Sequence, residues 1–74
     1  MPAATVKTWN DEEGWGVLVS PEVRGEIWAH FSAIDGPGYR GLEPGQTVTC
    51  DVEDLGGAVQ DGYRFRASGI VSAR

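Results

Sequence analysis

Glycine and proline are spread along the whole of this chain, and their spacing is the feature that most limits its fold. Eleven glycines and four prolines occur in 74 residues, and they interrupt nearly every window of ten residues. A long amphipathic helix therefore has no room to form. Because these residues are dispersed and not clustered, they indicate many turns and not a disordered tract.

Short runs of alternating apolar and polar residues lie between the turn residues. They span residues 4–10, 15–20, 26–31, 47–54 and 63–72. The stretch DGPGY (35–39) is typical of a loop, LEPGQ (42–46) predicts a Pro-Gly turn, and SAI (32–34) allows one short helical turn. Five short strands in a small chain predict an all-β barrel or sandwich, and closure into a barrel removes exposed sheet edges.

The length and residue content exclude several kinds of protein. A chain of 74 residues predicts a single domain spanning 1–74. Cys50 is the only cysteine and His30 the only histidine, so we expect no disulfide, no zinc site and no cofactor. No acidic residue has an obvious nucleophile or phosphate-binding loop beside it, so no catalytic residue is predicted and an enzyme is not expected.

The same sequence predicts a protein of the cytoplasm. No stretch approaches the roughly 20 apolar residues of a transmembrane helix. The start MPAATVK lacks the basic and apolar segments of a signal peptide. We therefore expect a monomeric, cytoplasmic protein with no membrane partner.

Alternation assigns the two faces of the fourth run. Val48, Cys50 and Val52 share one side, which predicts that Cys50 is a small buried hydrophobic residue. Thr49, Asp51 and Glu53 share the other side.

The second and third runs place tryptophan on the opposite side from their aliphatic residues. If Ile27 and Leu18 face the core, then Trp28 and His30 of the third run and Trp15 and Val17 of the second run face solvent. The reverse assignment is sterically possible, but it leaves Ile27 and Leu18 in water. Alternation therefore favours an exposed aromatic surface on two adjacent strands.

Two long stretches of the chain resemble the cold-shock domain. They are TVKTWNDEEGWGVLVSPE (5–22) and IWAHFSAIDGPGYRGLEPGQTV (27–48), and the most specific part is HFSAI followed by GYRGLEPGQTV. The resemblance runs from about Thr5 to Val52 and continues less clearly to Val71. The stretches DEEGWGV and DGYRFRA also resemble a divergent subgroup of these bacterial proteins.

The resemblance implies a five-stranded antiparallel Greek-key barrel of the oligonucleotide-binding type. Members of the family bind single-stranded RNA and single-stranded DNA with low sequence selectivity. They act as RNA chaperones and regulators of transcription and translation, often in the response to cold stress. Their two ribonucleoprotein motifs match EGWGVL (13–18) and IWAHF (27–31) in this sequence.

The residues predicted to bind nucleic acid follow from these motifs and from the runs beside them. They are Lys7, Trp9, Trp15, Val17, Trp28, His30, Phe31, Tyr39, Arg64, Phe65 and Arg66.

Three positions depart from the family pattern. Thr8 and Val17 stand where the family usually has aromatic residues, and Glu13 stands where it usually has lysine. A stacked base contributes about 1–3 kcal/mol to binding. The absence of two rings therefore predicts that this chain binds single strands by the same base stacking as a fully aromatic relative, but with lower affinity.

The charged residues and the histidine leave alternatives open. The net charge of −5 argues against a binder of phosphates, although a local field can differ from the net charge. Arg64 and Arg66 share a face, which is either an ordinary solvated strand face or a basic rim beside the aromatics. His30 is either structural or positioned to stack or donate to a ligand.

A second function is also compatible with these features. An exposed patch rich in tryptophan is typical of protein interfaces. A degenerate cold-shock barrel that serves as a protein-interaction module is therefore the alternative to nucleic-acid binding.

Overall fold

The computed structural model describes residues 2–35, 41–56 and 62–72, which form five strands and one short 3-10 helix. The strands are β1 Ala3–Asn10, β2 Trp15–Val19, β3 Ile27–His30, β4 Thr47–Asp54 and β5 Phe65–Ser72. The 3-10 helix η1, Phe31–Ala33, directly follows β3. Every predicted run contains a strand, and the helical turn predicted near residues 32–34 is present one residue earlier.

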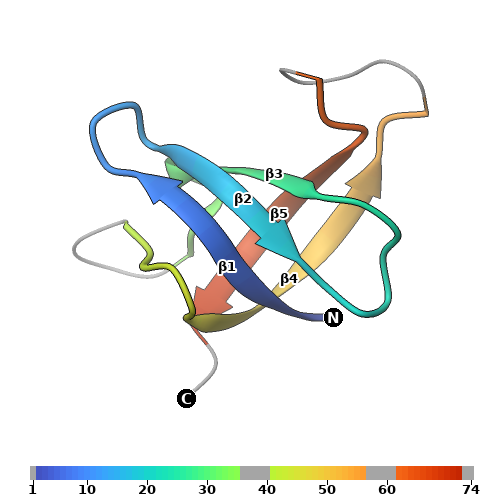
Figure 1. Cartoon of the computed structure of the whole chain (residues 1–74), viewed down its shortest axis with the longest axis horizontal. Helices are drawn as coiled ribbons and strands as arrows, with labels where there is room; N and C mark the ends of the chain where they lie inside the picture. Colours follow the sequence, from blue (N-terminus) through green and yellow to red (C-terminus); the bar gives the residue numbers. More distant parts are fainter. Residues whose placement is uncertain (1, 36–40, 57–61, 73–74) are drawn as a thin grey trace.

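The strands close into a barrel in the order β1-β2-β3-β5-β4 (Figure 1). This confirms the five-stranded barrel, but the expectation that it is wholly antiparallel was wrong for one pair. β3 and β5 run parallel, with Ile27 opposite Phe65 and Trp28 opposite Arg66. The reason is geometric: strand direction cannot alternate all the way around a closed ring with an odd number of strands.

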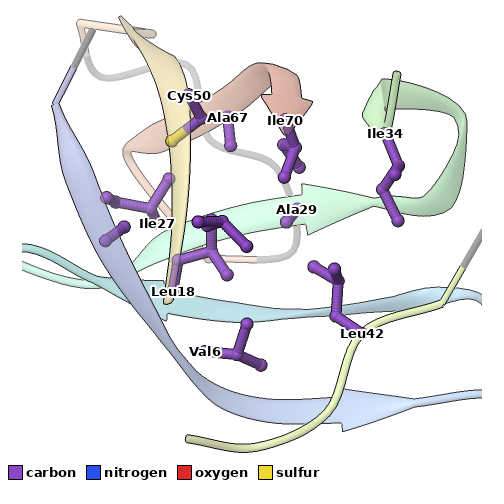
Figure 2. Packing of buried hydrophobic residues seen from close by; sticks show 11 residues of the cluster. Val6, Leu18, Ile27, Ala29, Ile34, Leu42, Cys50, Ala67 and Ile70 are labelled. Atoms are coloured by element: carbon purple, nitrogen blue, oxygen red, sulfur yellow. The ribbon is translucent and has the colours of Figure 1, made fainter. Parts of the chain in front are cut away.

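The interior of the barrel is filled by small and medium-sized aliphatic side chains from every strand (Figure 2). Leu18, Ile27, Val48 and Ile70 are fully buried there, and fully burying such a side chain contributes about 1.5–3 kcal/mol. The complete cluster is Ala4, Val6, Leu18, Ile27, Ala29, Ile34, Leu42, Val48, Cys50, Ala67 and Ile70. The assignment of Ile27 and Leu18 to the core is confirmed.

Cys50 is part of this core, as its alternation predicted. Its side chain is buried in the barrel (Figure 2). Burial, with a smaller contribution from the charge of Asp51, raises the pKa of the Cys50 thiol above 9.0. The thiol is therefore held in its neutral form and behaves as a hydrophobic group.

The chain enters β4 through the predicted Pro-Gly turn. The Gln46 amide donates a hydrogen bond of 3.0 Å to the Glu43 carbonyl. Gly45 has a φ of 91°, which the third position of a type II turn requires and which glycine adopts without strain. In the described parts of the chain, no helix is both long and apolar enough to cross a membrane.

A β-bulge in β1 changes which side chains face inward. The pairing of β1 with β2 shifts between Val6 and Thr8, so Lys7 is the extra residue. Val6 is buried before the bulge, and Trp9 packs against the core after it. Because one extra residue reverses the alternation, Lys7 and Thr8 are both exposed on the outside of the barrel.

Candidate nucleic-acid interface

One row of paired positions crosses the outside of all five strands. Val17 lies opposite both Thr8 and Trp28, Trp28 lies opposite Arg66, and Arg66 lies opposite Glu53. Directly paired residues project from the same side of a sheet. We call this set, Thr8, Val17, Trp28, Arg66 and Glu53, the outer row.

The outer row confirms the predicted direction of Trp28 and Val17 and corrects their predicted exposure. Both project away from the core cluster, yet Trp28 is only 9% exposed and Val17 only 4%. Alternation identifies the side of the sheet but not what covers that side. Trp28 is covered by the ring of Trp15 on β2 and the ring of His30 on its own strand.

These rings form a continuous group that we call the aromatic cluster: Trp15, Trp28, His30, Phe31 and Tyr63. Trp28 lies between Trp15 and His30, with ring centroids 6.4 Å and 5.6 Å away and interplanar angles of 26° and 19°. Tyr63 meets Trp15 edge-on at 6.3 Å, and Phe31 lies 4.5 Å from His30. Trp28 is thus the inner member of the cluster, and the more accessible rings surround it.

The side chain of Trp28 supports the cluster more than it presents a free surface. Its indole Nε1 is buried and has no hydrogen-bond partner. A buried donor without a partner costs about 1–3 kcal/mol. Phe31, at 41% exposed, is the cluster residue most open to a ligand.

Glycine makes room for the two ends of this surface. A Cβ on Gly14 would lie 2.7 Å from Cδ1 of Phe31, and the Phe31 amide donates a 2.8 Å hydrogen bond to the Gly14 carbonyl. A Cβ on Gly16 would overlap the Thr8 carbonyl oxygen and the Trp9 ring. Both glycines therefore leave space that a neighbouring ring occupies.

Acidic residues in the β1–β2 connection hold two indole groups. The Trp15 Nε1 donates to Glu13 Oε1 at 2.8 Å, and the Trp9 Nε1 donates to Asp11 Oδ1 at 3.0 Å. The Glu13 amide in turn donates to Asn10 Oδ1 at 3.0 Å. Glu13, which replaces the lysine usual in the family, therefore fixes the orientation of Trp15.

His30 is oriented by the residue two positions later. The Ser32 amide donates to His30 Nδ1 at 3.2 Å, and the Ser32 hydroxyl lies 2.8 Å from the same nitrogen. A nitrogen that accepts an amide proton carries a lone pair, so the neutral ring bears its proton on Nε2. His30 thus has a structural role as the cap of η1 and still has a donor at Nε2.

Three predicted cationic residues lie on the outside of the barrel, and each is paired with a carboxylate. Lys7 pairs with Glu26. Arg64 donates from Nε and Nη2 to the two carboxylate oxygens of Asp54, at 3.0 and 3.2 Å. Arg66 donates from Nη2 and Nε to Glu53 Oε1, at 2.6 and 3.2 Å.

The pairing shifts the pKa values of Lys7, Arg64 and Asp54. Hydrogen bonding to Glu26 raises the pKa of Lys7, and hydrogen bonding to Asp54 raises the pKa of Arg64. The hydrogen bond from Arg64, followed by that from the Gly56 amide, lowers the pKa of Asp54 below 3.8. In each of these three groups, pairing therefore favours the charged form.

Two grooves border the aromatic cluster. One, of about 400 Å³, is lined by Trp28, His30, Ser32, Ala33, Arg66, Ala67 and Ser68. The other, of about 270 Å³, is lined by Arg24, Gly25, Glu26, Gly62, Tyr63, Arg64 and Phe65. Each groove combines a ring of the cluster with a guanidinium group, which suits a flat polar ligand such as a nucleobase.

Two predicted aromatic site residues, Trp9 and Phe65, lie apart from the cluster. Trp9 and Phe65 are partly buried and pack against the core, Trp9 because of the bulge at Lys7. The Arg64 guanidinium lies 5.6 Å from the centre of the Phe65 ring. Tyr39 lies outside the described residues, as does most of the predicted DGPGY loop.

Several residues of the surface were missed from the sequence. Tyr63 joins the aromatic cluster although it was not among the predicted site residues; it precedes β5, so strand alternation does not place its side chain. The carboxylates of Glu26, Glu53 and Asp54 were not linked to the basic residues. Among the described residues, no group of three or more histidine, cysteine, aspartate or glutamate side chains is arranged to hold a metal ion.

Comparisons with known proteins agree with this geometry. The family described as the 'Cold-shock' DNA-binding domain matches residues 3–61. The chain is 46% identical over 54 residues to the major cold shock protein of Streptococcus pyogenes serotype M6, covering 73% of this chain and 79% of that protein.

Two further relatives come from other bacteria. The cold shock protein ScoF of Streptomyces coelicolor is 40% identical over 52 residues, covering 70% of this chain and 78% of that protein. The cold shock protein CspA of Staphylococcus saprophyticus is 46% identical over 54 residues, covering 70% and 77%. With the barrel and the family match over residues 3–61, these relatives show that the chain belongs to the cold-shock domain family.

Proposed function

We propose that this protein binds single-stranded RNA and DNA by stacking bases on the aromatic cluster and acts as an RNA chaperone in the cold-shock manner. The observation that carries the proposal is the continuous group of five rings on one side of the barrel, bordered by two grooves. A ring stacks on any base, so such a surface binds single strands with little sequence selectivity.

The membership of the family and the names of the relatives support the same function. The family is described as a DNA-binding domain, and the relatives are cold shock proteins. We propose that the chain works as one monomeric domain in the cytoplasm, where it keeps transcripts single-stranded and so affects transcription and translation.

The rings have different roles in the proposed mechanism. Phe31 and Trp15 offer stacking surface, Trp28 holds Trp15 and His30 in place, and the Nε2 proton of His30 reaches a base edge or a phosphate. Tyr63 extends the surface toward the smaller groove. Thr8 and Val17 contribute no ring, so we expect affinity below that of a fully aromatic relative.

The test is a titration with short pyrimidine-rich RNA and DNA at low salt, followed by tryptophan fluorescence. Quenching is expected with both ligands, because Trp15 and Trp28 belong to the cluster. Phe31→Ala should abolish most of the quenching with less than about 1 kcal/mol loss of stability, since the ring is exposed. Val71→Ala is a matched control, because Val71 is equally exposed at 41% and lies outside the cluster. Absence of quenching by either nucleic acid refutes the function.

The alternative function, a protein-interaction module, draws on the paired cations of the surface. A face whose basic groups are already neutralised is less suited to phosphates than the usual nucleic-acid surface. Affinity enrichment with and without nuclease separates the two functions. Partners that persist after nuclease treatment support the alternative, and partners released by nuclease support nucleic-acid binding.

A further inference from the structure

We propose that Glu26, Glu53 and Asp54 determine which strands this domain selects, by occupying the basic groups that would otherwise bind phosphate. The consequence is recognition through bases and not through backbone charge. This inference rests on the proposed binding of single strands, and it goes beyond it by assigning a selectivity role to three acidic residues.

The geometry of the two arginine pairs carries the first step. A guanidinium group binds phosphate and carboxylate through the same planar fork of N–H donors. In Arg64, Nε and Nη2 both donate to Asp54, and in Arg66 the same two groups donate to Glu53. One of the two donor edges of each guanidinium group, the Nε–Nη2 edge, is therefore already occupied by a carboxylate.

The carboxylates are held where they are by the fold. Asp54 Oδ1 also accepts a 2.8 Å hydrogen bond from the Gly56 amide, which anchors it independently of Arg64. Glu53 is the direct cross-strand partner of Arg66 in the β4–β5 pair. A phosphate that displaced Asp54 from Arg64 would still lie beside its negative charge, because the Gly56 amide keeps the carboxylate in place.

The third pair lies at the smaller groove, which it shares with Arg64. Lys7 is set on the outside of β1 by the bulge, and it pairs with Glu26 at the entrance to β3. Glu26 also lines the smaller groove together with Tyr63 and Arg64. Arg66 of one pair lines the larger groove, and Glu26 and Arg64 of the other two pairs line the smaller groove, which Arg24 also lines. A strand crossing the cluster therefore meets a paired cation at each groove.

The net charge of −5 gives the direction of the effect. Each phosphate contact releases counterions from a single strand. The logarithm of the binding constant therefore falls with the logarithm of the salt concentration, with a slope of about −0.7 per contact. Neutralised cations remove those contacts, and the surplus of negative charge repels the backbone until salt screens it. We therefore expect a salt slope close to zero.

The experiment compares two triple variants of the full chain. Glu26→Gln, Glu53→Gln and Asp54→Asn together free the three cations. Glu12→Gln, Glu22→Gln and Glu43→Gln remove three exposed acids that lie outside these pairs. Three charges are neutralised in each variant, so the net charge changes from −5 to −2 in both.

The expected result is a steeper salt slope only in the first variant. Freeing three cations adds about −2 to the slope, so binding of a thymidine oligonucleotide weakens roughly 15- to 20-fold more than in wild type between 50 and 200 mM salt. The wild type and the second variant should change little. Equal slopes in all three proteins, or a slope changed equally by both variants, overturn the inference.

A second ligand gives an independent readout. A methylphosphonate strand has the same bases and an uncharged backbone, and wild type should bind it at least as well as the natural strand. The first variant should favour the natural strand instead, and a wild type that prefers the natural strand overturns the inference. If the triple variant does not fold, Glu53→Gln alone should change the slope by about −0.7.

The outcome for the proposed function is separate. If wild type binds neither strand at any salt concentration, nucleic-acid binding itself is refuted. If it binds with a steep negative slope, the function stands and only the role of the three carboxylates is lost.

Discussion

Thr8 lies directly opposite Val17 across the β1–β2 pair, and Val17 lies directly opposite Trp28. The two positions at which this chain lacks the aromatic residues of its family are therefore neighbours in one row. The outer row therefore carries no ring at Thr8 and Val17, the two positions that precede Trp28 in it.

Thr8→Phe is expected to extend the aromatic cluster along the outer row. Thr8 is exposed, so a larger side chain meets no core residue. One additional stacked base contributes about 1–3 kcal/mol, which corresponds to roughly 5- to 150-fold tighter binding. Fluorescence titration with a single strand measures the change. Thr47→Phe, at an exposed strand position outside the outer row, is the control and should leave affinity unchanged.

Trp28→Ala is expected to destabilise the fold, whereas Trp28→Phe is expected to preserve it. Trp28 is buried between two rings, and removing a buried aromatic side chain costs about 3–5 kcal/mol. Phenylalanine keeps most of the packing and eliminates the unpartnered indole N–H, so its effect should stay within about 1 kcal/mol. Denaturant unfolding measures both, and equal stability of Trp28→Ala and wild type contradicts the supporting role of Trp28.

The Asp54–Arg64 pair is expected to make stability depend on pH in the acid range. The pKa of Asp54 is lower in the folded state, first because Arg64 donates to it and then because the Gly56 amide does. Its contribution is therefore present above the unfolded pKa of about 3.9 and is lost as the pH falls through the lower folded value. Asp54→Asn should be less stable than wild type at neutral pH and should converge with it at strongly acidic pH. A constant difference across the titration rules this out.

Cys50 is expected to resist thiol reagents as long as the barrel is folded. Burial raises the pKa of its thiol, and the thiolate is the reactive form. Because the folded state holds this proton more tightly, stability should decrease as the pH rises above the unfolded thiol pKa of about 8.5. Cys50 is the only cysteine of the chain, so the reaction of a chromogenic disulfide reports on it alone. Reaction at the unfolded rate in native buffer contradicts its burial.

The faces of the strands could be predicted because alternation depends only on local geometry. Ile27 and Leu18 had to be buried, and this fixed the direction of Trp28 and Val17. The burial of Trp28 could not be predicted in the same way, because one of the rings that cover it comes from another strand. Trp15, for example, stacks on Trp28 from the neighbouring strand β2, and only the register of the β2–β3 pair brings the two rings together.

The remaining differences arose where local rules are interrupted or where partners are distant. The bulge at Lys7 reversed the alternation and turned Trp9 toward the core, and no residue type in that stretch signals it. The pairing of Arg66 with Glu53 depends on the register of two strands. Alternation had already placed both on the outside, but only the register brings them together.

The parallel pair of β3 and β5 has a consequence for where a ligand can enter. A closed barrel of five strands must contain at least one parallel pair, because an odd number of strands cannot alternate in direction all the way round. The parallel pair of β3 and β5 has only two paired positions, followed by an isolated bridge between Ile34 and Ile70. The larger groove is lined by β3, η1 and β5 along this same seam. The opening beside the aromatic cluster thus lies where the two strands that the odd strand number makes parallel share few paired positions.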